Sequence, residues 1–247
     1  MTNMADVGQT GGEDTTRAEL DALHFITHEL KNSMVGIGGL AKRLMRTERD
    51  PERKKLLRVI YRQTKFLETM SSRFLLSAQI ETGEWEIQPE KIEDLYEEVI
   101  SPVITVLAKG PSSSPFRESR DMMETRDPIE VTADKNFLRI AYQNLLDNAL
   151  KYRHQDGKVA FDVEELKDEF RCSVWNEGPG VDPKETEKIF DKFYRSGGEG
   201  TRNSKGTGLG LYTARRIIEA HGGKMWCETE PGEWIRFVFT LPKETPV

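Results

Sequence analysis

The chain has 247 residues, of which 36% are hydrophobic and 32% are charged, and its formal net charge is −6. This length and composition suit two small folded domains. No apolar run is long enough to span a membrane and no signal peptide is present, so we expect a cytoplasmic protein without a membrane segment. The two cysteines, Cys172 and Cys227, lie in strand-like runs, and we expect them to be reduced core residues in a cytosolic setting.

Positive charge is concentrated near the N-terminus. Residues 17–81 hold 13 Lys/Arg and 8 Asp/Glu, a net charge of +5, which leaves −11 for the rest of the chain. Much of the excess lies in one short region: Lys42, Arg43, Arg46, Arg49, Arg53, Lys54, Lys55 and Arg58. Such a run is usually a solvated face, and the alternative is a dock for an acidic partner. No base-reading residues are interleaved, so we expect no nucleic-acid binding.

The first third of the chain predicts a helical hairpin. Residues 1–16 are polar and Gly/Thr-rich, which is typical of a disordered tail. Residues 17–81 contain two heptad seams, separated by the polar turn 47–51 with a proline placed to start the second helix. The seams are Leu23, Thr27, Leu30, Met34, Ile37, Ala41, Leu44 and then Leu56, Ile60, Gln63, Leu67, Met70, Phe74. Two helices cannot bury both seams alone, so we expect a homodimeric four-helix bundle.

His28 lies one residue off the first seam, at an edge that a partner can reach. A neutral imidazole nitrogen is a competent nucleophile toward phosphorus if the proton on its other nitrogen is accepted. Three glycines follow, Gly36, Gly38 and Gly39, and each costs roughly 1 kcal/mol relative to alanine in a helix interior. They either make the helix flexible or allow close helix packing, and the pattern leaves both open.

Residues 82–90 predict a linker and 91–247 a second domain, with a helix near 92–107 and a Pro/Ser-rich loop at 110–128. The most informative stretch is Asn144-Leu-Leu-Asp-Asn-Ala-Leu-Lys-Tyr152. On a helix, Asn144 and Asn148 share one face, and Lys151 follows one turn later. Amide oxygens suit a hard cation such as Mg²⁺, and lysine suits the phosphates that Mg²⁺ carries.

Two glycine boxes lie downstream. In the first, Val174-Trp-Asn-Glu-Gly-Pro-Gly-Val181, the glycines follow a strand-like run, where the backbone turns sharply beside a ligand. The second, Gly206-Thr-Gly-Leu-Gly-Leu211, precedes a helical pattern at 211–218. Glycine-rich backbone that opens a helix exposes N–H groups and the positive dipole end, which hold phosphates. Lys188-Ile-Phe-Asp-Lys-Phe-Tyr-Arg195 lies between the boxes.

In this order, the elements from about residue 128 to 242 resemble the ATP-binding domain of sensor histidine kinases, in the superfamily of gyrase, the Hsp90 chaperones and MutL. Phe25-Ile-Thr-His28-Glu-Leu-Lys-Asn32-Ser33 is similar to the phosphoacceptor box of the same kinases. The resemblance implies an α+β fold, with the antiparallel hairpin followed by a two-layer α/β sandwich, a mixed sheet under three helices. It also implies binding of ATP and Mg²⁺, autophosphorylation of His28, transfer to an aspartate of a response-regulator receiver domain, and dephosphorylation of that regulator.

The resemblance assigns roles residue by residue. His28 would be the phosphoacceptor, Glu29 the proton acceptor, and Asn32 the residue that positions water for dephosphorylation. Asn144 and Asn148 would hold Mg²⁺ and the phosphates, Lys151 would contact a phosphate, Tyr152 would flank the adenine and Asn176 would recognise its amino group. The other nucleotide-binding positions would be Gly178, Gly180, Phe190, Phe193, Lys205, Gly206, Thr207, Gly208, Leu209 and Gly210. Phe190 and Phe193 would anchor a lid at about 194–206.

Some positions depart from the family pattern. Ser33 stands where the family usually has proline, Asn176 where it has aspartate, and residues 232–237 lack the commoner Gly-Ser/Thr pattern. The amide of Asn176 offers both an acceptor and a donor, so it could suit adenine or guanine. Asn144 stands where ATP-hydrolysing relatives such as gyrase carry a glutamate, which favours transfer over hydrolysis.

Two alternative functions share part of this pattern. One is a non-catalytic, nucleotide-binding dimeric scaffold that regulates a partner kinase, and Asn144, Asn148 and Lys151 argue against it. The other is an anti-sigma-type serine kinase, which lacks a histidine hairpin.

Overall fold

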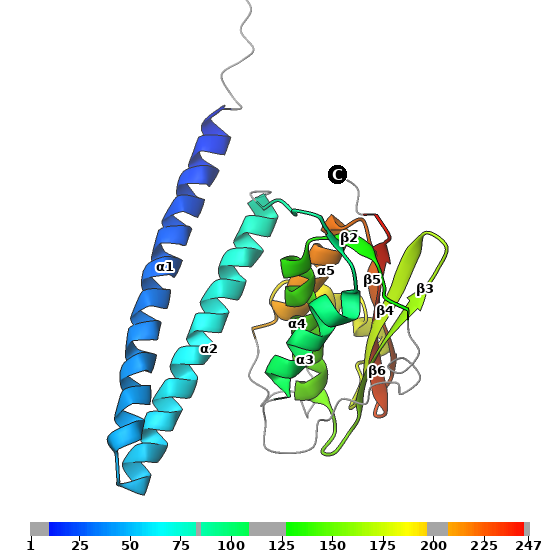
Figure 1. Cartoon of the computed structure of the whole chain (residues 1–247). Coiled ribbons are helices and arrows are strands. Elements are labelled where there is room, and N and C mark those ends of the chain that lie inside the picture. Colours follow the sequence, from blue (N-terminus) through cyan, green and yellow to red (C-terminus); the bar gives the residue numbers. More distant parts are fainter. Residues whose placement is uncertain (1–9, 83–84, 109–126, 197–206, 245–247) are drawn as a thin grey trace, which may run out of the picture. The chain divides into compact units, whose positions relative to one another are not determined.

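The computed structural model describes residues 10–82, 85–108, 127–196 and 207–244 (Figure 1). The chain divides into two compact units, Met1–Trp85 and Glu86–Val247. The first unit contains two long helices, and the second combines helices with β-sheet, so the α+β expectation is confirmed. Most of the loop predicted at 110–128 lies outside the described residues, as does the part of the expected lid after residue 196. No helix in the described ranges is long and apolar enough to cross a membrane.

The first unit is an antiparallel pair of helices, α1 (Thr10–Thr47) and α2 (Pro51–Thr82). The turn between them is closed by carboxylates that accept backbone N–H groups. Glu48 Oε1 accepts from Arg49 N and Asp50 N at 2.9 Å each, and Asp50 Oδ1 accepts from Glu52 N at 2.8 Å and Arg53 N at 3.2 Å. Asp50 thus caps α2 one residue before its first-turn proline, as the sequence pattern predicts.

The first helix begins earlier than predicted. Residues 1–16 were expected to be disordered, but α1 already begins at Thr10. A helix that is nucleated within an apolar seam extends at little cost, because each added residue gains one backbone hydrogen bond. Polar composition alone did not reveal this extension.

The first seam divides between two sides of α1. Thr27 and Ala41 are buried against α2, whereas Leu30, Ile37 and Leu44 are 47%, 49% and 54% exposed. Gly38 lies on the buried side, where a Cβ atom would come within 2.9 Å of Thr64 Oγ1. Alternate seam positions therefore pack within the chain and leave an apolar stripe uncovered.

The second unit begins with elements that the sequence placed imprecisely. The predicted linker 82–90 overlaps the end of α2 and the start of strand β1 (Glu90–Ile92), which pairs antiparallel with β2 (Val131–Ala133). The helix predicted near 92–107 instead begins at Tyr96, with one π-helical turn η1 (Tyr96–Ile100) before α3 (Ser101–Leu107).

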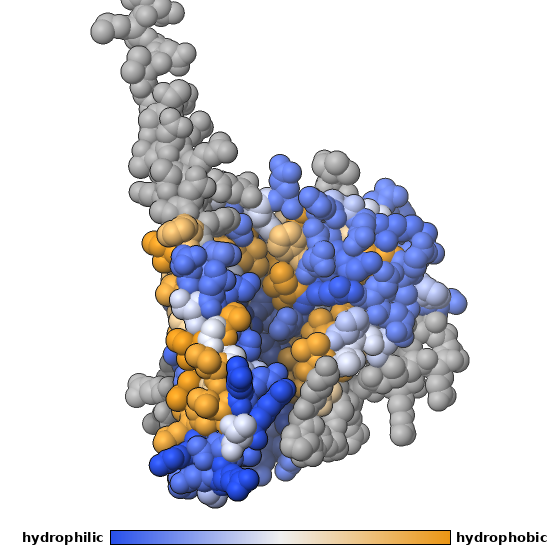
Figure 2. All heavy atoms as spheres, turned by 60° about the vertical axis from the view of Figure 1, so that its left-hand side comes forward, coloured by the Kyte–Doolittle hydropathy of each residue, from blue (hydrophilic) through white to orange (hydrophobic). Residues whose placement is uncertain are grey.

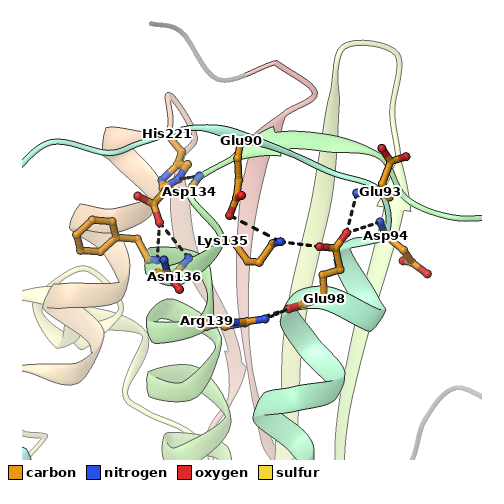
Figure 3. Close-up of polar contacts among 10 residues, drawn as sticks. Glu90, Glu93, Asp94, Glu98, Asp134, Lys135, Asn136, Arg139 and His221 are labelled. Carbon is orange, nitrogen blue, oxygen red and sulfur yellow. Dashed lines mark hydrogen bonds and ion pairs between the residues drawn. The ribbon is translucent and has the colours of Figure 1, made fainter.

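A proline accounts for a neighbouring polar contact. Pro102 has no N–H group, so it cannot donate to the carbonyl oxygen of Glu98, its partner four residues back in an α-helix. The Arg139 guanidinium donates to that oxygen instead, from Nε at 3.0 Å and from a terminal nitrogen at 2.7 Å (Figure 3). The contact ties η1 to α4 (Lys135–Tyr152).

The main sheet has four antiparallel strands in the order β3-β4-β6-β5. Their bounds are β3 Val159–Glu165, β4 Glu169–Glu177, β5 Met225–Glu230 and β6 Trp234–Pro242. The strands of this sheet pair antiparallel rather than in the expected mixed arrangement, and the parallel pairing seen in the described ranges is an isolated bridge between Thr132 of β2 and Glu244, two residues after β6. Helices α3, α4 and α5 (Gly210–Ala220) lie on one side of this sheet (Figure 1), so the two-layer sandwich is confirmed.

Strand alternation explains the core beneath these helices. In β4, Phe170, Cys172, Val174 and Asn176 are buried while the residues between them are more exposed. The register aligns Val159, Asn176, Ile235 and Thr229 in one row across all four strands. Both cysteines are free, and burial raises the pKa of the Cys172 thiol to about 12. The polar residue Asn176 is thus buried between Val159 and Ile235 in this row.

Candidate functional site

Helix α4 is fixed at its start by Asp134. One carboxylate oxygen, Oδ1, accepts from Asn136 N and Phe137 N at 3.0 Å each, and the other accepts from Gln88 N at 2.9 Å. The Asp134 N–H donates to Nε2 of the buried His221 at 3.0 Å (Figure 3). His221 Nδ1 therefore carries the ring proton and donates to Ile217 O at 2.7 Å. Burial lowers the pKa of His221, so the neutral ring is favoured.

Charged groups join the first turn of α4 to the elements before it. Lys135 Nζ lies 2.6 Å from Glu98 Oε2 and 3.7 Å from Glu90 Oε1. Glu98 Oε1 accepts from Glu93 N at 2.8 Å and Asp94 N at 3.3 Å (Figure 3). Lys135, through its hydrogen bond, and these backbone donors hold the pKa of Glu98 below its ordinary value. The helix that bears the two asparagines is thereby anchored at its N-terminal end.

The four polar residues predicted on α4 lie in its second half. Asn144 is 5% exposed and Asn148 is half-buried, whereas Lys151 is exposed. Lys151 Nζ lies 2.9 Å from the Tyr152 hydroxyl and 4.4 Å from the centre of its ring. A Cβ atom at Gly210 would lie 3.5 Å from Asn144 Oδ1. The structure therefore brings Asn144 to the start of α5.

Asn176 is buried at the end of β4. Its Nδ2 group donates to the Glu177 carbonyl at 3.3 Å, and its Oδ1 atom is buried without a hydrogen-bond partner in the described part of the chain. The donor is thus engaged by the backbone, which leaves the acceptor for a ligand. A donor such as an exocyclic amino group would satisfy it.

The glycines of the first box are required by close packing. A Cβ atom at Gly178 would come within 2.6 Å of Tyr152 O and 2.7 Å of Asn176 Nδ2. Gly180 has φ +63° and would meet Thr229 Oγ1 at 2.7 Å. Sequence reasoning expected a sharp turn here beside a ligand. The structure gives a more specific reason, since the turn is packed against α4 and against the β5–β6 hairpin.

The second glycine box meets the segment that precedes the expected lid. Phe193 has φ +65°, and its N–H donates to Gly208 O at 3.0 Å. Gly208 has φ +70°, and a Cβ atom there would lie 2.5 Å from the Phe193 carbonyl carbon. Phe190 is buried in a 3-10 turn, η4 (Lys188–Phe190), with its ring 6.4 Å from that of Phe237, whereas Phe193 is 54% exposed. Lys205 and Gly206 lie outside the described residues.

The N-terminus of α5 has no side-chain cap among the described residues. The helix begins at Gly210, one residue before the predicted helical pattern, and its N-cap residue Leu209 makes no side-chain hydrogen bond. Leu209 N donates to the Thr207 hydroxyl oxygen at 3.2 Å. The Leu209 side chain has no acceptor, so the cap residue does not satisfy the first N–H groups of α5. A helix end of this kind favours phosphate oxygens through its N–H groups and its dipole.

Three structural contributors to this site were not found from the sequence. Asp134 precedes a helical pattern and had a recognisable N-cap signal. Glu185, in the 3-10 turn η3 (Pro183–Glu185), accepts from the Tyr194 hydroxyl at 2.7 Å and the Ser196 hydroxyl at 2.5 Å, and these bonds, that from Ser196 first, lower its pKa. Thr229 has no local sequence signal, because its partners come from other strands and loops.

His28 is exposed on α1. Glu29 Oε1 and Asn32 Nδ2 lie 3.5 Å and 3.2 Å from the same ring nitrogen, His28 Nδ1. The side chains of His28 and Glu29 are 70% and 58% exposed. Asn32 can donate only to an unprotonated Nδ1, whereas Glu29 can accept only from a protonated Nδ1. The tautomer that carries its proton on Nδ1, next to Glu29, is therefore the one that leaves a lone pair on Nε2.

The residues present fit Mg²⁺ only together with phosphates. The described residues contain no group of three or more His, Cys, Asp or Glu side chains that could hold a metal ion. They do contain a buried, unpartnered Asn144 Nδ2 group, next to the N-terminus of α5. Asn144 and Asn148 can each offer a neutral amide oxygen to a cation whose remaining ligands are phosphate oxygens and water.

Family models match both units. Residues 18–83 match the His Kinase A (phospho-acceptor) domain, and residues 133–245 match the histidine kinase-, DNA gyrase B-, and HSP90-like ATPase. The chain is 29% identical over 232 residues to the sensor protein KdpD of Clostridium acetobutylicum, covering 92% of this chain and 25% of that protein. It is 40% identical over 116 residues to the sensor histidine kinase WalK of Bacillus subtilis, covering 46% and 19%. The chain thus spans a quarter or less of these two relatives.

Solved structures agree. The catalytic domain of histidine kinase ThkA is 30% identical with a TM-score of 0.51, and the match covers 63% of this chain and 99% of that one. ThkA in complex with the response regulator protein TrrA is 27% identical with a TM-score of 0.56, covering 98% and 68%.

Proposed function

Because this chain belongs to the histidine kinase family, we propose that it is the catalytic core of a two-component sensor kinase. In this proposal it binds MgATP, phosphorylates His28 and passes the phosphoryl group to an aspartate of a response regulator. A cytosolic setting is part of the proposal, since ATP and the free thiols of Cys172 and Cys227 both belong there.

Two buried amide groups carry the nucleotide proposal. Asn144 Nδ2 is a donor and Asn176 Oδ1 is an acceptor, and neither has a partner among the described residues. An unsatisfied buried polar group costs about 1–3 kcal/mol, so a folded site that keeps two of them is built to receive complementary groups. A phosphate oxygen satisfies the first and the adenine amino group the second.

The orientation of Asn176 supports adenine over guanine. Its amide could in principle rotate, but the Glu177 carbonyl accepts from Nδ2 and so holds Oδ1 toward the site. Guanine would place a carbonyl oxygen against Oδ1, and two acceptors repel. A neutral asparagine can thereby reproduce the preference that the family usually obtains from aspartate.

Residues of this chain would divide the phosphate chemistry between them. Bound Mg²⁺ supplies neutralisation of the charge on the transferred phosphoryl group. Asn144 and Asn148 would hold it through amide oxygens, and the exposed Lys151 would meet a phosphate as a point charge. The N–H groups at the start of α5 would receive phosphate oxygens. The amides of Asn144 and Asn148 cannot act as a base toward water, which favours phosphoryl transfer over ATP hydrolysis.

The phosphoacceptor chemistry is proposed for His28. With the Nδ1 proton accepted by Glu29, the Nε2 lone pair attacks the γ-phosphorus, an N–P bond forms and the bond to ADP breaks. Glu29 is the nearby carboxylate at 3.5 Å from Nδ1. Asn32 lies 3.2 Å from the same nitrogen, where its amide could position water for dephosphorylating the regulator.

We propose that a second copy of the hairpin covers the exposed apolar stripe. On α1 the stripe includes Leu30, Ile37 and Leu44, and on α2 it includes Leu56, Ile60, Leu67 and Phe74, which are 63%, 44%, 41% and 40% exposed. Apolar side chains gather along the hairpin in the view of Figure 2. Stable monomers rarely expose so continuous an apolar surface. Substituting Ile37 with Asp should shift the mass measured in solution from dimer to monomer.

We propose that the basic residues around the hairpin turn dock the response regulator. The group from Lys42 to Arg58 that surrounds the turn is exposed, apart from Lys54, which is half-buried. A receiver domain carries an acidic phosphoacceptor pocket, so opposite charges would speed and orient the encounter. The ThkA–TrrA complex supports a partner of this class.

Labelling with ATP that carries ³²P at the γ position tests the proposal. The protein should take up label that is lost in acid and kept in alkali, as a phosphoramidate is. His28→Gln should abolish the label, whereas His24→Gln, one helical turn away, should retain it. Equal labelling of the His28→Gln protein would refute the assignment. Label that survives acid would instead support a serine kinase.

A further inference from the structure

Thr229 stands in the same row of the sheet as the proposed base-recognition residue. The register runs from Asn176 in β4 through Ile235 in β6 to Thr229 in β5. Because side chains of paired residues lie on the same face of a sheet, Thr229 lies on the face that carries the buried Asn176 and Ile235. This is the face covered by the helices.

The Thr229 hydroxyl bridges two segments. Its oxygen accepts from Val181 N at 3.1 Å, and it donates its proton to the Trp234 carbonyl at 3.1 Å. One hydroxyl thus satisfies an N–H group after the first glycine box and a carbonyl at the start of β6. A Cβ atom at Gly180 would come within 2.7 Å of the same oxygen.

Backbone hydrogen bonds hold the rest of this turn to the β5–β6 hairpin. Gly178 N donates to Glu233 O at 3.0 Å, and Gly232 N donates to Pro179 O at 2.8 Å. Thr229 adds a third attachment, at Val181. The turn that follows Asn176 is therefore fixed to the hairpin at Gly178, Pro179 and Val181.

We infer that Thr229 is a positioning residue for nucleotide binding, acting through the turn at residues 178–181. The inference rests on the proposed function, since the turn follows the residue proposed to recognise the base. If the turn is already ordered before the ligand arrives, binding does not lose the conformational entropy of ordering it, and the affinity is higher. Removing the hydroxyl leaves Val181 N–H and Trp234 O without this partner, so part of that ordering falls on the binding step.

Thr229→Val removes the hydroxyl and keeps the shape, and Thr229→Ser restores the hydroxyl. Thr240→Val is a matched control, because Thr240 is buried in the neighbouring strand and its hydroxyl accepts from Lys224 N at 3.2 Å, away from the turn. Hydrogen exchange of the Val181 amide, measured without nucleotide, should become about fivefold faster in Thr229→Val and change little in the other two.

Nucleotide titration gives the second readout. ATP affinity should fall about fivefold in Thr229→Val and stay within twofold of the parent in Thr229→Ser and Thr240→Val. The KM for ATP should rise while the labelling rate at saturating ATP is kept, because the residue touches no reacting atom. If Thr229→Val does not fold, Thr229→Ala and Thr229→Ser provide the same comparison.

Two results would overturn the inference. One is equal loss of ATP affinity in Thr229→Val and Thr240→Val, which would indicate general destabilisation. The other is Thr229→Ser behaving like Thr229→Val, which would indicate that the methyl group matters and the hydroxyl does not. A parent protein that binds no ATP would refute the proposed function instead, and the exchange measurement distinguishes that case.

Discussion

Alanine at each of the three glycines of α1 separates helix flexibility from helix packing. Gly38 faces α2, where a Cβ atom would come within 2.9 Å of Thr64 Oγ1 and 3.6 Å of Thr64 Cβ. Gly36 and Gly39 have no such neighbour within 4 Å. The two groups of positions therefore predict opposite effects of the same substitution.

The magnitudes follow from these surroundings. Alanine in an exposed helix interior is more favourable than glycine by about 1 kcal/mol, so Gly36→Ala and Gly39→Ala should each raise the free energy of unfolding by that amount. Gly38→Ala gains the same term but overpacks a buried contact, at a cost of about 1–3 kcal/mol. It also presses on a hydroxyl that donates to Tyr61 O at 2.8 Å. The net expectation for Gly38→Ala is a loss of up to about 2 kcal/mol.

Urea unfolding followed by circular dichroism measures these differences, at one protein concentration because association changes apparent stability. Autophosphorylation of the same variants tests flexibility. If Gly36 and Gly39 supply no needed bend, labelling should stay within twofold of the parent. A Gly38→Ala protein as stable as Gly36→Ala would refute the packing argument. Gly36→Ala or Gly39→Ala proteins that are less stable than the parent would mean that another surface covers these positions.

Three further predictions concern the second unit. Asn176→Asp should lower the free energy of unfolding without nucleotide by about 1–3 kcal/mol, because an oxygen replaces the Nδ2 group that donates to Glu177 O. The same substitution should raise the ATP/GTP affinity ratio about fivefold, since a charged acceptor binds the adenine amino group more strongly than a neutral one. Paired titration calorimetry and unfolding check both, and an unchanged ratio would contradict the role in base recognition. Arg139→Met should lower the free energy of unfolding by about 1–3 kcal/mol in the parent protein. The loss should be smaller in a Pro102→Ala background, where residue 102 has an N–H group that can donate to the same carbonyl. Additive effects of the two substitutions in a double-mutant cycle would refute this. Burial lowers the pKa of His221, so below pH 6.5 the unfolded chain takes up a proton at this residue that the native chain does not. As the pH is lowered from 6.5 to the folded pKa, the free energy of unfolding should therefore decrease by at most about 1.4 kcal/mol per pH unit. His221→Gln should flatten that part of the stability–pH curve, and an unchanged slope would contradict it.

Sequence patterns predicted the helices that depend on residues a few positions apart. The spacing of Asn144, Asn148 and Lys151 indicated one helix, and the structure has α4 there. The glycine box before residue 211 indicated a helix start, and α5 begins at Gly210. Helix periodicity, capping and glycine-rich turns depend on residues a few positions apart, so they can be read from a single chain.

Partners from distant parts of the chain could not be predicted. A heptad seam shows that Thr27 and Leu30 share a stripe, but not that the first packs within the chain while the second stays exposed. A side chain at position 180 would clash with Thr229, which lies in β5, about 50 residues further along the chain. The contact from Arg139 to the Glu98 carbonyl in the π-helical turn at 96–100 likewise joins residues 41 positions apart, so no local pattern indicates it. Residues 10–16 show the same limit, since their helix extends from a seam that begins later.

The order of the strands has a consequence for how the protein is made. β6 is the last strand in sequence, yet it lies between β4 and β5 in the sheet. During synthesis from the N-terminus, β4 and β5 therefore leave the ribosome before the strand that joins them. The row from Asn176 to Thr229 is complete only when Ile235 of β6 has emerged as well. Until then the edges of β4 and β5 that pair with β6 are open to other strands, and a ligand that needs this row cannot yet stabilise the nascent domain.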